Sequence, residues 1–203
     1  MRRLNDLSSL FAKVSRIAVV TTDCCQAHCA HCLMESSPDR SNRLYVDDVI
    51  AFVDGLMSKA PVKMVVFTGG ESTLLGDDLL EMISYCASNG LLTRLVTNAA
   101  WAIDELSAEG MLKDLRDAGL SEINFSTDDF HIPWVPFGNI KRAWDASKGK
   151  GFLSVLVATC SGPSSDLTPE GIRERLQDNL DIFHSEDELE DLLFRRRLRG
   201  LGI

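Results

Sequence analysis

The sequence lacks any hydrophobic run of the roughly 18 residues that a membrane-spanning helix needs. Residues 1–16 begin with basic side chains but lack the continuous apolar core of a secretory signal, so they predict a short amphipathic helix. These absences predict a cytoplasmic protein with no membrane partner.

The sequence also lacks a surplus of positive charge. Its 203 residues include 30 acidic side chains against 21 lysines and arginines, a net charge of -9. Such a charge repels nucleic-acid phosphates, so no nucleic-acid partner is expected. The hydrophobic content of 45% and charged content of 25% are ordinary for a folded protein and allow one domain with a sizeable core.

A spread-out disulfide framework is absent as well. Four of the six cysteines lie within the segment 23–32, DCCQAHCAHC, together with two of the four histidines. Cys86 and Cys160 stand alone in apolar segments and are expected to be buried free thiols. This distribution favours a reducing compartment and a metal site over disulfides.

What the sequence does contain is a regular alternation of short β-branched runs and longer amphipathic segments. The runs predict strands at 16–22, 62–70, 91–98, 121–129 and 152–160, and the amphipathic segments predict helices at 46–60, 77–90, 104–119, 138–151 and 168–178. Strand–helix repetition predicts an α/β fold with a parallel sheet. Five units fit a (β/α) barrel or an open doubly wound sheet, and we predict a partial TIM-type barrel of five or six units.

Polar, glycine or metal-binding residues follow four successive predicted strands. The cysteine segment follows the first strand, TGGES (68–72) the second, TNA (97–99) the third and STDDFH (126–131) the fourth. Because chemistry in such folds lies beyond the carboxyl ends of the strands, these segments are expected to build one site.

The end of the chain breaks the pattern. Residues 185–191 are densely acidic and residues 195–200 densely basic, while 179–183 is only a weak candidate for a sixth strand. The segment 179–203 is compatible with a closing helix, a solvated end, or a chain cut short relative to a larger protein.

Cys25, Cys29 and Cys32 form the pattern C-x3-C-x2-C. A loop of this length can wrap three thiolates around an iron–sulfur cube and leave the fourth iron open to a small molecule. Zinc stays possible from the loop alone, with Cys24, His28 or His31 as a fourth ligand, although ligand count and softness favour the cluster.

The cysteine triad at the end of the first strand, followed by GGE at the end of the second, resembles the radical S-adenosylmethionine (radical SAM) family over residues 16–160. The resemblance implies a core domain at 1–178 with a cluster loop at 23–34, followed by the charged segment 179–203. It also implies that Cys25, Cys29 and Cys32 bind three irons of a 4Fe-4S cluster while SAM chelates the fourth.

The same resemblance implies a set of SAM contacts: His31, Gly69, Gly70, Glu71, Ser72, Asn98, Ser126 and Asp128. His31 stands where the family often has an aromatic residue near the adenine. Residues 69–71 match the segment that contacts the methionine amino group, because a close backbone needs residues without Cβ and an ammonium group favours a carboxylate. Ser72 departs from the proline common after this glutamate. Asn98, Ser126 and Asp128 match positions that hold the SAM carboxylate and ribose.

The implied activity is that of an oxidoreductase that cleaves SAM reductively to a 5′-deoxyadenosyl radical, which abstracts hydrogen from a peptide or a small metabolite. An external electron donor such as a flavodoxin or ferredoxin is implied, because no second cysteine cluster follows that would form an auxiliary-cluster domain. Cys24 is expected to pack at the strand end. His131 is a candidate substrate contact, although a loop residue of no direct role is the commoner case. A zinc-binding module without catalysis and a partner-dependent, truncated radical SAM fold are the two alternatives.

Overall fold

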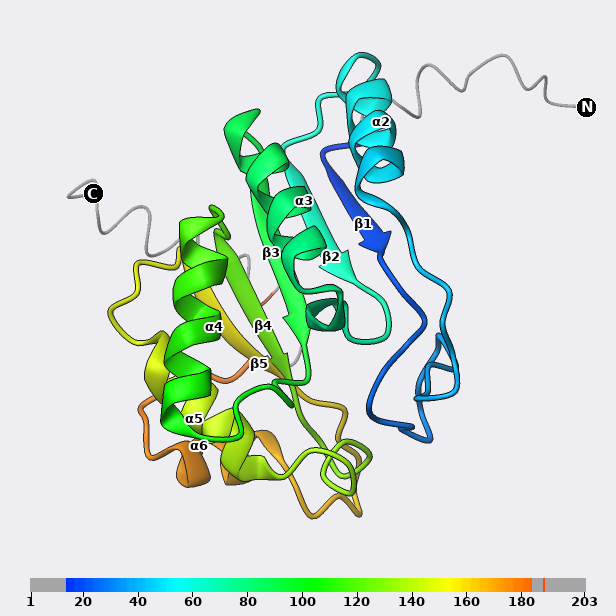
Figure 1. The fold of residues 1–203 in the computed structure, drawn as a ribbon. Coiled ribbons are helices and arrows are strands. Elements are labelled where there is room, and N and C mark those ends of the chain that lie inside the picture. The colour runs from blue at the N-terminus through cyan, green and yellow to red at the C-terminus, as the bar shows by residue number, and fades with distance from the viewer. Residues whose placement is uncertain (1–13, 184–187, 189–203) are drawn as a thin grey trace, which may run out of the picture.

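Five parallel strands form one sheet in the computed structural model, which describes residues 14–183 and Glu188 (Figure 1). The strands are β1 (Arg16–Val20), β2 (Met64–Thr68), β3 (Leu92–Thr97), β4 (Glu122–Ser126) and β5 (Ser154–Ala158). Their spatial order is their order in the sequence, β1-β2-β3-β4-β5. A doubly wound sheet reverses its strand order at a switch point, whereas this sheet does not, so the predicted partial (β/α) barrel is confirmed.

The helices cover one face of the sheet, as α3 and α4 in front of the strands in Figure 1 show. They are α2 (Val46–Met57), α3 (Asp77–Ser88), α4 (Glu105–Asp117), α5 (Phe137–Ser147) and α6 (Pro169–Leu176). Each helix packs against the next one along the chain, as repeated right-handed crossovers require. All ten predicted elements are therefore present. A short 3-10 helix, η1 (Ser72–Leu75), was not predicted.

The core lies between the sheet and this helix layer. Val65, Phe67, Leu95, Ile123 and Phe125 alternate along the three central strands and are fully buried. The helices cover them with apolar side chains that include Leu79, Met82, Ile83, Leu112 and Leu115. Burying each such side chain contributes about 1.5–3 kcal/mol, so the period-two pattern of the strands fixes which face the helices cover.

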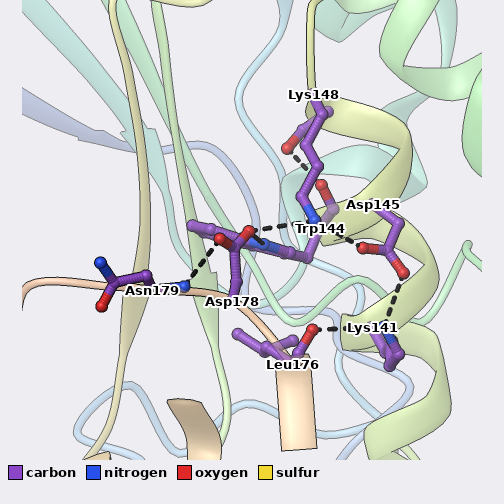
Figure 2. Close-up of polar contacts among 8 residues, drawn as sticks. Lys141, Trp144, Asp145, Lys148, Leu176, Asp178 and Asn179 are labelled. Atoms are coloured by element: carbon purple, nitrogen blue, oxygen red, sulfur yellow. Dashed lines mark hydrogen bonds and ion pairs between the residues drawn. The ribbon is translucent and has the colours of Figure 1, made fainter. Parts of the chain in front are cut away.

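Side-chain contacts fasten the last described helix, α6, to α5 (Figure 2). The indole Nε1 of Trp144 donates to the carboxylate of Asp178 at 2.9 Å, just beyond the end of α6. Lys148 bridges the same carboxylate at 3.0 Å and Asp145 at 2.9 Å. At its other end α6 begins as predicted, with Thr168 accepting a hydrogen bond from the Gly171 amide at 3.2 Å. These contacts hold the final unit against the barrel.

One prediction about local structure is wrong: Cys160 is exposed, whereas Cys86 is buried as predicted. Residues 179–183, the weak candidate for a sixth strand, form no strand. Within the described part no helix is long and apolar enough to cross a bilayer. The predicted amphipathic helix at the N-terminus falls mostly on residues 1–13, and the acidic and basic runs fall on 184–203. Apart from Glu188 these segments lie outside the described residues, so the boundary between 1–178 and 179–203 stays a prediction.

Candidate functional site

A cavity of about 280 Å³ opens at the carboxyl ends of the strands. Its wall contains eight of the eleven predicted site residues, namely Cys25, Cys29, His31, Cys32, Gly69, Gly70, Asn98 and Ser126. These residues come from the segments after β1, β2, β3 and β4. As predicted, residues at four strand ends therefore line one cavity.

The loop that carries the cysteines is held by backbone contacts to the segment that returns to α2. Thr22 forms an isolated antiparallel bridge with Arg43, and Cys24 forms a parallel bridge with Ser37. Cys24 does not line the cavity, as expected for a residue that packs at the strand end. The bridges fix the base of the loop, so the three cysteines beyond them face one space.

The cysteine thiols lie in each other's electrostatic field. Burial raises the pKa of Cys25 to about 11, and the nearby charges of Glu71 and Cys32 add to this effect. Burial likewise raises the pKa of Cys29 to about 11, with Cys25, Asp128 and Cys32 contributing. Thiols crowded in this way ionise readily only when a cation compensates their charges, which is what a bound metal centre does.

Gly69 and Gly70 sit where the turn after β2 meets the cysteine loop. The Gly70 amide donates to the Thr22 carbonyl at 2.6 Å, and the Glu71 amide donates to the Cys24 carbonyl at 2.8 Å. A Cβ on Gly69, whose φ is 139°, would overlap the Thr22 carbonyl oxygen, and one on Gly70 would overlap that of Cys24. The close backbone contact to the cysteine loop therefore requires glycine at both positions. From the sequence, the glycines were explained by a ligand close to the backbone instead.

Glu71 lies behind the cavity wall. Its side chain is 1% exposed, and its carboxylate accepts hydrogen bonds from the Thr97 hydroxyl at 2.8 Å, the Asn98 amide at 2.8 Å and the Thr73 hydroxyl at 2.7 Å. Burial raises the pKa of Glu71, although the hydrogen bonds oppose this shift. In this arrangement the carboxylate braces the end of β3 against η1.

Ser72 is also behind the wall and is fully buried. Its hydroxyl accepts from the Thr21 hydroxyl at 2.8 Å and donates to the Thr68 carbonyl at 3.1 Å. These bonds explain why serine serves at a position where the resembled family commonly has proline. Its role in the structure is to fix the start of η1 against β1 and β2.

Asn98 connects β3 to the cysteine loop. Its side-chain oxygen accepts from Gln26 Nε2 at 2.9 Å, and its Nδ2 lies 3.5 Å from the Cys25 sulfur. Gln26 was not predicted from the sequence. The only available signal was a polar side chain between Cys25 and Cys29, which by itself does not identify a partner some seventy residues away.

Asp128 is the third predicted site residue behind the wall, with 2% of its surface exposed. Its carboxylate lies 2.7 Å from His131 Nδ1 and 3.2 Å from His31 Nε2. Both histidines line the cavity, although His131 was predicted only as a candidate. Asp128 therefore reaches the cavity through two imidazoles.

His31 forms part of an aromatic shelf beside the cysteines. Its ring stacks on Phe130 with a centroid separation of 4.6 Å and meets the edge of His131 at 5.1 Å. Its Nδ1 is enclosed and has no hydrogen-bond partner in the described part of the chain. A flat ring that lines the cavity suits contact with a planar heterocycle.

The zinc alternative needs a fourth ligand next to the three cysteines. Cys24 and His28 do not line the cavity, and His28 is exposed. His31 does line it, but its Nε2 is engaged by Asp128 and its ring is stacked. Three soft thiolates that share one open cavity fit a metal centre with an open coordination position better than a closed structural zinc site.

Comparison with known families and proteins agrees with the resemblance seen in the sequence. The family model of the radical SAM superfamily matches residues 19–147. The putative peptide biosynthesis protein YydG of Bacillus subtilis (strain 168) is 24% identical over 156 residues, covering 77% of this chain and 48% of that protein. The chain spans between a quarter and a half of the length of the curated relatives that it matches.

Two solved structures share the fold. The radical S-adenosylmethionine methyltransferase TsrM from Kitasatospora setae, solved with cobalamin and a 4Fe-4S cluster, gives a TM-score of 0.54 at 19% identity over 81% of this chain and 31% of TsrM. The protein anSMEcpe, solved with bound AdoMet, gives a TM-score of 0.53 at 17% identity over 70% of this chain and 43% of that one. The likeness extends over the barrel described above.

Proposed function

Because this chain belongs to the radical SAM superfamily, we propose that Cys25, Cys29 and Cys32 bind a 4Fe-4S cluster and that the adjoining cavity binds S-adenosylmethionine. The observation that carries this proposal is the cavity itself, whose wall joins the three thiols to residues from three further strand ends. Curated relatives of this chain include proteins named as cyclases, and a catalytic role is expected for this chain as well.

The donor set supports a cluster with one open iron. Three thiolates are soft ligands that favour iron–sulfur centres, and no fourth protein ligand gathers beside them among the described residues. Cys25, Cys29 and Cys32 would hold the cluster, which would supply the electron for reductive cleavage of SAM and so the radical chemistry that removes a hydrogen atom from a substrate.

The residues of this chain bind and orient the cofactor. His31 offers its ring to the adenine, and the turn at 69–70 brings backbone groups to the cavity without side chains. Asn98 and Ser126 offer polar side chains to the carboxylate and ribose. Glu71, Ser72 and Asp128 support these residues from behind the wall. Positioning of this kind accounts for most of what a protein adds to cofactor chemistry.

We propose a peptide as the substrate, since the Bacillus relative is named as a putative peptide biosynthesis protein. A small metabolite is the alternative that a substrate screen would reveal. An external flavodoxin or ferredoxin would deliver the electron, and the proposed setting is the reducing cytosol, because all six cysteines are free thiols.

The test is reductive cleavage of SAM by the full chain. The protein is purified anaerobically, reconstituted with iron and sulfide, reduced with dithionite and incubated with SAM. The proposal predicts formation of 5′-deoxyadenosine and methionine, detected by mass spectrometry. A protein that holds one tightly bound zinc and forms neither product would contradict it.

A further inference from the structure

Asp128 is held rigidly at the end of β4. Its Oδ1 accepts from the backbone amides of Phe130 at 2.9 Å and His131 at 3.0 Å, in addition to the ring of His131 at 2.7 Å. Its Oδ2 accepts from the Cys160 amide at 3.3 Å and lies 3.2 Å from His31 Nε2. Five contacts on a nearly inaccessible carboxylate leave it no freedom to turn toward the cavity.

The bond to His131 determines where that imidazole carries its proton. Burial alone would raise the pKa of Asp128, but the hydrogen bonds and charge of His131, with the charge of His31, outweigh burial and hold the pKa at about 2. The carboxylate is therefore ionised at neutral pH and can only accept hydrogen bonds. His131 Nδ1 must donate to it, so a neutral His131 has its lone pair on Nε2.

Nε2 is the atom of His131 that stays open. His131 lines the cavity, and its side chain is 17% exposed. Within the part of the chain that the structure describes, Nε2 has no hydrogen-bond partner and is not fully enclosed. A fixed lone pair at the edge of a cavity is a hydrogen-bond acceptor with no assigned donor.

We propose that His131 Nε2 accepts a hydrogen bond from a hydroxyl, amine or amide N–H of the substrate, and that Asp128 is the positioning residue that fixes this tautomer. This inference rests on the proposed function and adds to it that the substrate lies next to SAM, at the edge of the same cavity that His131 lines. It assigns His131 to the substrate because Gly69, Gly70, Asn98 and Ser126 already supply partners for the polar groups of SAM. It names a substrate class as well: one with a polar donor near the reacting carbon.

The tautomer can be measured without catalysis. Protein labelled with ¹⁵N-histidine, with its cluster in the oxidised diamagnetic state, is examined by long-range ¹H–¹⁵N correlation, and His131→Gln identifies the His131 signals among the four histidines. We expect the proton on Nδ1 in the wild type and a weakened Nδ1–H preference in Asp128→Asn. A proton on Nε2 of wild-type His131 would overturn the proposal.

Whether His131 contacts the substrate or SAM is tested by the affinity of the reconstituted protein for SAM, measured by titration calorimetry. We expect His131→Gln to change the Kd for SAM by no more than about threefold, whereas Ser126→Ala, in the proposed SAM site, should weaken it about tenfold, as one lost hydrogen bond does. A tenfold loss in His131→Gln would show that His131 contacts SAM and would contradict the assignment. If wild-type protein bound no SAM, the proposed function would fail, while the tautomer measurement would still test Asp128 and His131.

Discussion

Gly70 is the residue at which the cysteine loop and the turn after β2 come closest. A Cβ at this position would overlap the Cys24 carbonyl, and because the overlap involves backbone on both sides, no side chain can move aside to relieve it. The contact joins the two motifs on which the family resemblance depends. The cavity and the stability of the fold therefore both depend on this contact.

We predict that Gly70→Ala lowers the free energy of unfolding by about 3 kcal/mol, as overpacking of rigid backbone does, and that it prevents stable cluster binding. Urea denaturation and iron content measure the two effects. Gly110→Ala is the matched control, because Gly110 lies in α4 with open space around its Cα and should gain about 0.5–1 kcal/mol from alanine's helix propensity. Equal stability of the two variants would contradict this account of Gly70.

At this scale the sequence predicted residue identities better than their orientations. The motif located Gly69, Gly70 and Asn98 at the cavity wall. It also named Glu71 and Asp128, but their carboxylates turn inward to Thr97, Asn98 and the histidines. Orientation depends on donors contributed by distant segments, and spacing within one motif contains no information about them.

At the scale of elements, the carboxylate of Asp178 links the end of α6 to α5. The hydrogen bond from Trp144 and that from Lys148 lower the pKa of Asp178. A carboxyl group whose pKa is lower in the folded state stabilises the fold at neutral pH, and this contribution is lost as the pH falls through the folded value. The stabilisation that Asp178 contributes should therefore decrease at acid pH.

We predict that Asp178→Asn costs about 0.5–1 kcal/mol near pH 7, since Asp178 is partly exposed and solvent screens the ion pair. The difference from the wild type should shrink as the pH is lowered below about 4, where the wild-type carboxyl group becomes protonated. Urea denaturation across this range measures it. Asp39→Asn, at an exposed position with no ion pair among the described residues, is the control. A difference that grew toward acid pH would contradict the assignment.

Hydrophobic periodicity predicted ten elements because each carries an apolar pattern long enough to show its period. It missed η1, whose four residues are too short to show one, and it extended several strands beyond their hydrogen-bonded parts. Cys160 was predicted to be buried because it follows an apolar run. In the structure it lies past the end of β5, a strand paired only with β4 among the described strands, where less of the chain covers it.

At the scale of the whole molecule, the cavity exists only because four strand ends meet. Each of the four segments contributes residues to its wall, and the sequential strand order brings them together in chain order. The sequence could predict this convergence from the positions of the motifs. The volume of the cavity and the supporting network behind its wall required the three-dimensional structure.

The account predicts that removing any one of the three ligand cysteines has the same effect on the whole site. Alanine at Cys25, Cys29 or Cys32 should abolish iron retention after reconstitution, because the remaining two thiolates cannot hold the cluster. Alanine at Cys24 should leave iron content within about a fifth of the wild type, since Cys24 contributes its backbone to the site and its thiol does not line the cavity. Iron lost equally from Cys24→Ala would mean that the loop uses a different set of ligands.

The most direct test of the central claim is the electron paramagnetic resonance spectrum of the reduced, reconstituted protein with and without SAM. The account predicts a reduced-cluster signal whose g values and line shape change when SAM is added, because SAM would bind the iron that the three cysteines leave open. A cluster signal that SAM leaves unchanged, or a colourless protein with no signal, would contradict it.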